Sequence, residues 1–304
     1  MITVVGEALI DLVIDPAGHV TAALGGAPFN TARACGRLGA DVTFVGVLSD
    51  DRFGSMLRDQ LVADGVDVSC APVVGAPTTL AAAELDERGA ASYRFYIEGT
   101  SAPALDHEPV LAADGVVFTG GLALVLEPMA STVEQLVTSA TDDRVVVLDV
   151  NCRPLVIDDR DAYVERVRRV VARTAIVKVS DEDLAWLADV PPLETARRWA
   201  GEGPALVIVT MGGRGAVGMT SDGRRVEVGA PRVTVADTVG AGDSFMAGLI
   251  DGLWSADLLG ADRRTALRRA SDATIRVVLE RCARIAAITV SRPGADPPRR
   301  SELS

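Results

Sequence analysis

Short runs of β-branched and other apolar residues recur along the chain, and stretches with helical periodicity lie between many of them. The apolar runs are at 2–5, 42–47, 116–119, 145–149, 175–179 and 206–210. The helix-like stretches include 52–64, 127–140, 160–172 and 193–200. Strands that are apolar on both faces and alternate with helices are typical of a mainly parallel sheet covered on both sides. This alternation predicts an α/β fold, with one domain over residues 1–304.

Two segments interrupt the alternation. Residues 10–24 have the pattern of a hairpin that turns at 15–18, and residues 78–97 have the pattern of two strands joined at 86–89. We predict that they form a small antiparallel layer, which projects from the main sheet and acts as a lid. The alternative is that they only extend the edge of that sheet.

The C-terminal half contains three further patterns. Residues 215–228 predict another hairpin, and residues 261–290 predict helices whose many arginines form a solvated face. Residues 295–304 are polar and rich in proline, which predicts a frayed tail.

Charge and cysteine content narrow the functional classes. The formal net charge is −12, which argues against nucleic acid or an anionic membrane surface as a partner. The apolar run at 1–14 is broken by Glu7 and Asp11 and lacks a basic region and a cleavage site, so it does not have the pattern of a signal peptide. The four cysteines lack metal-ligand spacing. These features predict a cytoplasmic protein with reduced cysteines.

The most informative motif is DTVGAGDSF at 237–245. It follows a strand-like run, and apolar residues recur at helical spacing after it, so Gly240, Ala241 and Gly242 are expected at the start of a helix. Backbone N–H groups at a helix start favour an anion such as phosphate. Asp243, next to such an anion, is placed to accept a proton from an attacking hydroxyl. The alternative is a simple turn with Asp243 as a helix cap.

Together with GGAPFNTARACGRLG at 25–39, this motif resembles the two signatures of the PfkB or ribokinase-like carbohydrate kinases. The resemblance extends over residues 5–298. It implies a ribokinase-like fold and transfer of a phosphoryl group from ATP to a sugar hydroxyl. In the family, the aspartate that matches Asp243 is the catalytic base, and the N–H groups that match those of residues 241–243 form an anion hole.

The resemblance also implies an acceptor pocket. The family positions that match Asp11, Gly25, Gly26 and Asn30 line that pocket, and Arg153 matches an arginine directed at phosphate or sugar. Alternatives remain open for three of these residues. Asp11 has the context of a turn aspartate, Asn30 that of a helix-start residue, and Arg153 that of a surface ion pair.

On the nucleotide side, Ser180 and Asp183 occupy the place of the family's Asn-x-x-Glu motif, which organises magnesium-bound water and phosphate. Because serine replaces asparagine and aspartate replaces glutamate, the sequence leaves open whether Glu182 or Asp183 orders the metal shell. Mg²⁺ is expected because it bridges the phosphate oxygens during transfer.

Later loops complete the nucleotide side of the implied site. Thr210, Gly212 and Gly215 resemble the family's nucleotide loop, and Ser291 lies in the segment expected beside the adenine. Many relatives hold potassium between an aspartate and late-loop carbonyls, which implies K⁺ at Asp237 and Gly294. A simple turn at Gly294 fits equally well.

Local strings such as GEALIDL at 6–12 and GGAPFN at 25–30 are similar to those of bacterial fructokinases, so fructose is the expected acceptor. Ribose, 2-keto-3-deoxygluconate and nucleosides are alternatives on the same fold. A sugar-binding regulator without catalysis and a dinucleotide-dependent oxidoreductase are alternatives of another class, although the GxGxxG turn is missing from the first strand. Lid strands sometimes pair between subunits in this family, which implies a homodimer.

Overall fold

The structure is a computed structural model, and it describes residues 1–86, 91–109, 115–140, 144–260 and 263–303. Its centre is a nine-stranded sheet in the order β15-β14-β13-β12-β11-β10-β1-β4-β6. The strands are β1 (Ile2–Val5), β4 (Val42–Val45), β6 (Val66–Asp67), β10 (Val116–Gly120), β11 (Val145–Asp149), β12 (Ile176–Ser180), β13 (Leu206–Thr210), β14 (Ala216–Thr220) and β15 (Arg225–Val228). Neighbours from β13 to β6 are parallel, and β14 and β15 are antiparallel. The mainly parallel sheet and the hairpin at 215–228 are therefore confirmed.

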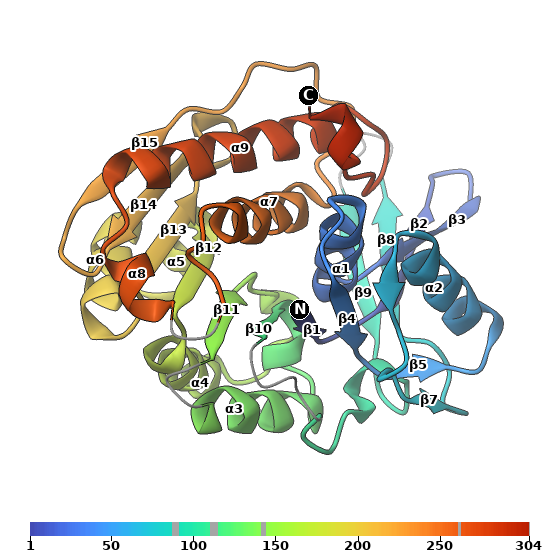
Figure 1. The fold of residues 1–304 in the computed structure, drawn as a ribbon. Helices are drawn as coiled ribbons and strands as arrows, with labels where there is room; N and C mark the ends of the chain where they lie inside the picture. The colour runs from blue at the N-terminus through green and yellow to red at the C-terminus, as the bar shows by residue number, and fades with distance from the viewer. Residues whose placement is uncertain (87–90, 110–114, 141–143, 261–262, 304) are drawn as a thin grey trace.

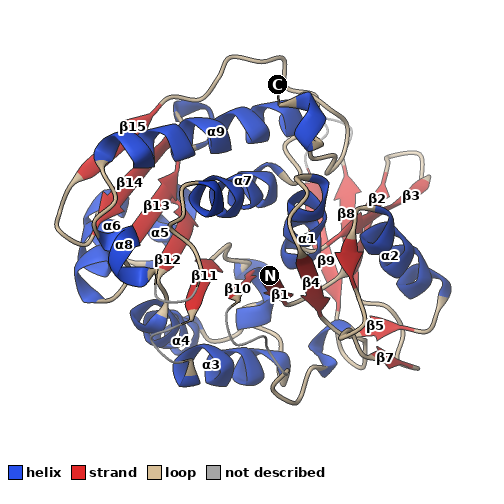
Figure 2. Cartoon of the chain, in the orientation of Figure 1, coloured by secondary structure: helices blue, strands red, loops and turns tan. Residues whose placement is uncertain are grey.

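Helices cover both faces of this sheet, as Figures 1 and 2 show. One face carries α1 (Ala27–Arg37), α2 (Arg52–Ala63), α7 (Ala241–Ser255), α8 (Arg264–Arg268) and α9 (Asp272–Val290). The other carries α3 (Met129–Ser139), α4 (Arg160–Arg173), α5 (Asp181–Leu187) and α6 (Pro192–Glu202). Phe118 and Val147 pack into the first layer, whereas Val117 and Val146 pack into the second. Burial on both faces is why the strand sequences are continuously apolar.

The two interrupting segments form a separate four-stranded sheet, in the order β3-β2-β8-β9. Its strands are β2 (Leu9–Ile14), β3 (Val20–Gly25), β8 (Leu80–Leu85) and β9 (Ala91–Tyr96), and it lies to one side of the main sheet in Figure 1. The prediction of a purely antiparallel layer is wrong in one respect, because β2 and β8 pair in parallel. The first strands of the two hairpins lie side by side and run in the same direction. Most of the expected turn at 86–89 lies outside the described residues.

Short elements complete the chain. Strands β5 (Leu48–Ser49) and β7 (Val73–Val74) pair with each other. Among the described residues, 3₁₀ turns lie at η1 (Ala102–Ala104), η2 (Gly121–Leu124), η3 (Pro154–Val156), η4 (Gly212–Arg214) and η5 (Arg300–Glu302). In the described parts of the chain, no helix is both long and apolar enough to cross a membrane.

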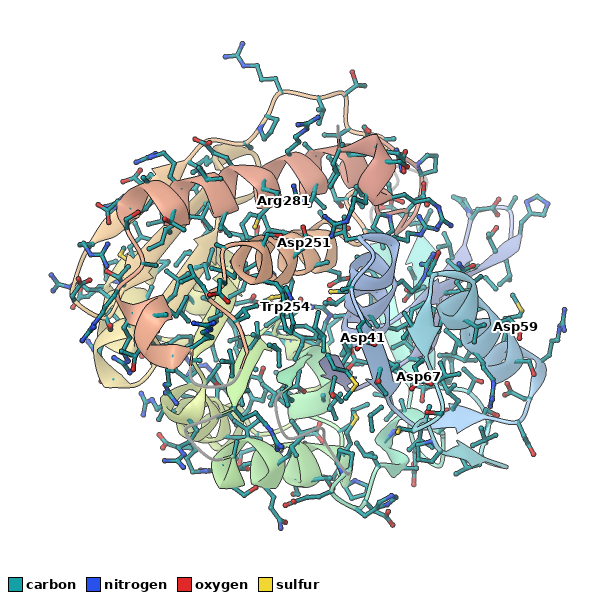
Figure 3. All side chains as sticks on the ribbon, in the orientation of Figure 1. Asp41, Asp59, Asp67, Asp251, Trp254 and Arg281 are labelled. Carbon is teal, nitrogen blue, oxygen red and sulfur yellow. The ribbon has the colours of Figure 1, made fainter. Side chains whose placement is uncertain are left out.

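The prediction of a frayed tail at 295–304 is wrong for residues 295–303, which the structure describes. Pro297 and Pro298 are buried, and the Arg300 guanidinium pairs with Asp251 in α7 and donates to the carbonyl oxygen of Leu38 at 2.5 Å. Figure 3 shows Asp251 close to Arg281, which donates to the same carboxylate. Polar composition predicted a frayed tail, but Arg300 contacts a buried carboxylate and a carbonyl oxygen that are distant in sequence.

Candidate active site

The Asp243 carboxylate lies at the contact between the two signature motifs. Asp243 is the third residue of α7 and makes no capping hydrogen bond; its Oδ2 accepts from Nδ2 of Asn30, in the first turn of α1, at 2.9 Å. The two residues are only 8% and 6% exposed. The helix-cap alternative for Asp243 and the helix-start alternative for Asn30 therefore do not account for their side chains. Both are directed at the interface between α1 and α7.

Burial raises the pKa of Asp243 to about 6, and the nearby charge of Asp149 adds to this effect. The Asn30 hydrogen bond and the cations Lys178 and Arg153 act in the opposite direction. An ionised carboxylate with a pKa just below neutral is suited to general-base catalysis, because it is unprotonated at pH 7 yet basic enough to take a proton.

The turn before Asp243 directs backbone N–H groups away from the helix. Gly240 has a φ of +75°, a left-handed conformation that glycine adopts readily. The N–H of Ala241 donates weakly to the carbonyl oxygen of Thr238 at 3.4 Å. Within the described part of the chain, the N–H groups of Gly242 and Asp243 have no acceptor. The start of α7 can therefore accept an anion, with two N–H groups fully available and a third weakly engaged.

Lys178 lies directly against this turn, and sequence reasoning did not select it. Its Nζ pairs with Oδ2 of Asp149 at 2.7 Å, and both side chains are buried. A Cβ added to Gly242 would lie 3.2 Å from the Lys178 Nζ, so glycine at this position leaves room for the ammonium group. The available signal was a lysine inside β12, with apolar residues at 176, 177 and 179 on either side of it.

The acceptor-side residues converge at the ends of β1 and β2. The carboxylate of Asp11 lies over Gly25, where a Cβ would come within 2.0 Å of Asp11 Oδ2. Burial raises the pKa of Asp11 to about 6, and the positive charge of Arg153 opposes the rise. Asp11 lies inside β2, so it is not a turn residue. Gly26 precedes α1 with a φ of +104°, and a Cβ there would meet the carbonyl oxygen of Glu7 at 2.7 Å.

Glu7 is a second residue that sequence reasoning did not select. Its Oε1 accepts from the N–H of Ala27 at 3.2 Å, and its Oε2 is buried without a partner among the described residues. Burial raises the pKa of Glu7 to about 8. The signal was a glutamate within a run that is otherwise apolar, which is uncommon unless the side chain is satisfied inside.

The Arg153 guanidinium is held by its own loop. Its Nη1 donates to Oδ1 of Asn151 at 2.6 Å and to the carbonyl oxygen of Cys152 at 2.9 Å. Asn151 has a φ of +40°, a conformation that asparagine tolerates better than most residues. The charge of Arg153 influences Glu7, Asp11 and Asp243 from this position. Arg153 therefore lies near the site carboxylates, and the alternative of a surface ion pair does not account for its position.

Ser180 and Asp183 form a reciprocal cap at the start of α5. The Ser180 Oγ accepts from the N–H of Asp183 at 2.9 Å, and Oδ2 of Asp183 accepts from the N–H of Ser180 at 3.2 Å. The other oxygen, Oδ1, accepts from the N–H of Cys152 at 3.1 Å. Glu182 is exposed. Asp183 thus connects α5 to the Arg153 loop, a structural role that the S-x-x-D pattern itself predicts.

The remaining predicted residues lie in loops after β13 and α9. Thr210 ends β13, and the turn at 211–215 closes with the N–H of Met211 donating to the carbonyl oxygen of Gly215 at 2.9 Å. Gly215 must lack a side chain because a Cβ would lie 2.0 Å from the carbonyl oxygen of Val228. The hydroxyl of Ser291 donates to the carbonyl oxygen of Ile288 at 2.7 Å, at the end of α9.

Asp237 and Gly294, the predicted potassium ligands, do meet. Oδ2 of Asp237 accepts from the N–H of Gly294 at 2.9 Å, and Oδ1 accepts from the N–H of Val239 at 3.0 Å. Gly294 has a φ of +70°, which also agrees with the alternative of a simple turn at this residue. This contact brings the segment after α9 to the start of α7.

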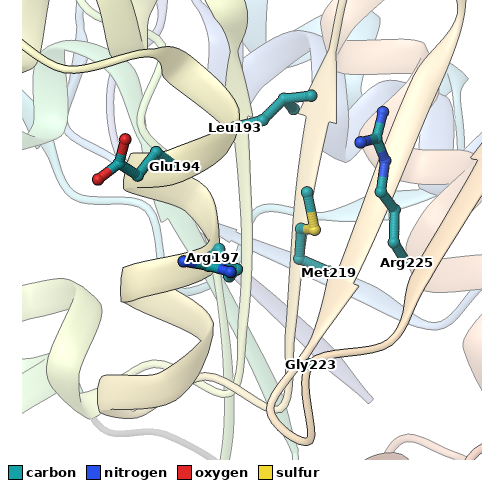
Figure 4. Close-up of a pocket in the computed structure, with 6 residues that line it drawn as sticks. All are labelled: Leu193, Glu194, Arg197, Met219, Gly223 and Arg225. Carbon is teal, nitrogen blue, oxygen red and sulfur yellow. The ribbon is translucent and has the colours of Figure 1, made fainter.

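A pocket of about 390 Å³ lies elsewhere, between α6 and the β14–β15 hairpin (Figure 4). Its lining residues are Leu193, Glu194, Arg197, Met219, Gly223 and Arg225. Gly223 lies in the turn after β14, beyond the end of β13 that is opposite to Thr210. None of the residues that surround Asp243 lines it.

Comparisons with known proteins agree with this arrangement. The model of the pfkB family of carbohydrate kinases matches residues 1–299. The fructokinase of Rhizobium leguminosarum bv. trifolii is 40% identical over 270 residues, which cover 85% of this chain and 81% of that protein.

Two crystal structures of fructokinases share the fold. A fructokinase from Xylella fastidiosa with bound ATP has a TM-score of 0.89 at 27% identity, over 99% of this chain and 96% of that one. A double-mutant fructokinase from Vibrio cholerae O395 with fructose, ADP and a potassium ion has a TM-score of 0.86 at 26% identity, again over 99% and 96%. The chain therefore belongs to the pfkB family of carbohydrate kinases, as a fructokinase-like member with the ribokinase-like fold.

Proposed function

We propose that the chain transfers the γ-phosphoryl group of ATP to a primary hydroxyl of fructose, with Asp243 as the general base. The observation that carries this proposal is the buried Asp243 carboxylate beside N–H groups of the same helix turn that have no acceptor among the described residues. A base and an anion site within one turn are what phosphoryl transfer to an alcohol requires. Fructose is favoured because the 40% identical relative is a fructokinase.

In the proposed reaction, the acceptor oxygen bonds to the γ-phosphorus as the bond to the β-phosphate oxygen breaks. The hydroxyl proton passes to Asp243. The N–H groups of Gly242 and Asp243 bind the charge on the transferred group, with the Lys178 ammonium beneath them. Asp149 keeps Lys178 in place through the 2.7 Å ion pair.

The acceptor sugar lies between the two motifs in this proposal. The Asp11 carboxylate can accept from sugar hydroxyls, and Arg153 can donate to an oxygen of the sugar or of phosphate. Oδ1 of Asn30 is buried and has no partner in the described structure, so a sugar hydroxyl would satisfy it. The four-stranded sheet carries Asp11 on β2 and is proposed to close over the acceptor as a lid.

The metal ions belong to the same proposal. No group of three or more His, Cys, Asp or Glu side chains in the described structure forms a metal site. Mg²⁺ does not need such a cluster, because it commonly binds through substrate phosphates and water with only one or two carboxylates. Here those carboxylates would be Asp183 or Asp149. Mg²⁺ would neutralise charge on the phosphates. Potassium fits at Asp237, although hydrogen bonds from Gly294 and Val239 already engage the carboxylate.

A coupled assay of ADP release tests the proposal. Fructose, ribose, 2-keto-3-deoxygluconate and adenosine are supplied in turn with ATP, Mg²⁺ and K⁺. We expect fructose to give the highest kcat/KM, and Asp243→Asn to lower kcat about 10²- to 10⁴-fold through loss of the general base. Asp257→Asn, which changes an exposed aspartate just after the end of α7, is the matched control.

Three results would contradict parts of the proposal. A preference for adenosine would replace the sugar acceptor with a nucleoside. Full turnover by Asp243→Asn would remove the proposed base. Calorimetric binding of fructose without ADP release from the parent protein would indicate a regulator.

A further inference from the structure

The C-terminal segment 294–303 lies against the loop that starts α7. Gly294 donates its N–H to Asp237, the first residue of the DTVGAG motif at 237–242. Ala295 packs against Gly240, where an added Cβ would be only 2.8 Å from the Ala295 Cβ. Gly240 holds the left-handed conformation that aims the following N–H groups. The position of residues 294–295 therefore limits how this turn can move.

Two arginines of α1 hold that segment in place. Nη1 of Arg33 donates to the carbonyl oxygen of Ala295 at 3.3 Å. Nη1 of Arg37 donates to the carbonyl oxygen of Pro297 at 2.7 Å and pairs with Asp296. These bonds run from the rigid helix to the backbone on both sides of Asp296.

A single buried carboxylate orients both arginines. The side chain of Asp64 is 0% exposed, and it accepts from Nε of Arg33 and from Nε of Arg37, each at 2.8 Å. Gln60 donates to Asp64 as well, at 2.9 Å, and no hydrogen bond joins it to the tail in the described structure. With Nε engaged by Asp64, each guanidinium presents its terminal nitrogens to the tail.

The same helix also holds the proposed base. Asn30, Arg33 and Arg37 are three and four residues apart, so they follow one side of α1. Asn30 contacts Asp243, and the arginines contact the segment behind Gly240. One helix thus sets the position of the carboxylate relative to the turn that carries the anion-binding N–H groups.

We propose that Arg33 and Arg37 are positioning residues for phosphoryl transfer: oriented by Asp64, they hold residues 295–297 against the Gly240 turn and so keep its N–H groups aimed at the transferred group. This inference rests on the proposed role of the α7 start. It predicts an effect on kcat rather than on acceptor binding, because no hydrogen bond joins Asn30 or Asp11 to residues 295–297 in the described structure.

Two variants and one control test it. Arg37→Met keeps the aliphatic stem and removes the donors to the tail, and Asp296→Ala changes a residue whose side chain is 47% exposed, so it is expected to fold. Gln60→Met removes a partner of Asp64 without touching the tail. We expect Arg37→Met and Asp296→Ala to lower kcat roughly 10- to 100-fold, the size of a small misplacement of reacting groups, with less than about threefold change in KM for fructose. Gln60→Met keeps the parental kcat.

Amide hydrogen exchange supplies a readout that does not need activity. The amides of residues 240–244 are expected to exchange faster in Arg37→Met and Asp296→Ala than in Gln60→Met. Arg37→Lys, which can still reach one carbonyl oxygen, should recover part of kcat. Parental kcat and exchange in both tail variants would overturn the inference, as would an equal loss in Gln60→Met. Failure of the kinase proposal would give a different result from failure of this inference, because the parent protein itself would then release no ADP with any acceptor.

Discussion

At the residue scale, the most unusual group is the carboxyl of Glu7, which is enclosed at the end of β1. Burial raises its pKa to about 8, and the backbone N–H groups of Ala27 and Leu122 and the charge of Arg153 offset only part of the rise. The folded protein therefore keeps the Glu7 carboxyl protonated at neutral pH, whereas in the unfolded chain the carboxyl loses its proton near its ordinary pKa of 4.5. A protonated carboxyl can remain inside the protein without a cationic partner.

Glu7→Gln should therefore change how stability depends on pH. Between the unfolded pKa of 4.5 and the folded pKa of about 8, the parent's folded state binds the extra proton, so its free energy of unfolding falls as pH rises. At pH 7 the stabilisation that Glu7 contributes is lower by on the order of 3 kcal/mol than it is at a pH below both pKa values. Glutamine does not titrate, so the variant lacks this decline. Urea unfolding at several values between pH 5 and 8 measures it.

The informative quantity is the difference between parent and variant, since Asp11 and Asp243 contribute the same slope to both. Glu182→Gln, which replaces an exposed carboxylate, is the matched control and should follow the parent. Parallel curves for the parent and Glu7→Gln would show that Glu7 is ionised inside the fold.

At the element scale, the start of α5 connects two loops of the site. Ser180 and Asp183 cap the helix reciprocally, and Asp183 also accepts from the N–H of Cys152 in the loop that positions Arg153. This arrangement bears on the choice that the sequence left open. Burial raises the pKa of Asp149, and the nearby charge of Asp183 adds to the rise, whereas Glu182 is exposed.

We expect three α5 variants to separate capping from magnesium binding. Ser180→Ala should lower the free energy of unfolding by about 1 kcal/mol, the usual cost of a lost N-cap. Asp183→Ala should in addition raise the Mg²⁺ concentration for half-maximal activity roughly tenfold, as loss of an outer-shell partner does. Glu182→Ala should leave both unchanged. If Glu182→Ala alone changes the Mg²⁺ requirement, the assignment is reversed.

At the scale of the whole molecule, the four-stranded sheet leaves much of β3 exposed. Its two edge strands, β3 and β9, carry exposed apolar side chains: Val20 is 58%, Tyr93 50% and Tyr96 52% exposed. Unpaired edge strands with apolar side chains readily pair with another chain. These edges are therefore where we expect a second copy of the chain to pair.

We expect the protein to be a dimer that Val20→Glu and Tyr96→Glu each shift toward monomer, because both would place a charge in the paired surface. Sedimentation velocity over a range of protein concentrations measures the change. Val277→Glu alters a valine on α9 that is 65% exposed and lies away from this sheet, and it should leave the dimer intact. A monomeric parent protein at every concentration would refute the expectation.

The sequence by itself determined the architecture and the family. Apolar runs that alternate with helices predicted the parallel sheet, and the signatures at 25–39 and 237–243 predicted which helix starts would carry the site. Such features are local, since each run or turn has a propensity that its own residues carry.

Only the tertiary structure decided which distant side chains become partners. It brought Asn30 to Asp243, Lys178 to Asp149 and Gly242, and Arg37 to a tail that composition had predicted to be frayed. It also paired β2 with β8 in parallel. Hydrogen bonds and ion pairs depend on separations of a few ångströms, and chain folding sets these between residues whose sequence spacing carries no such information.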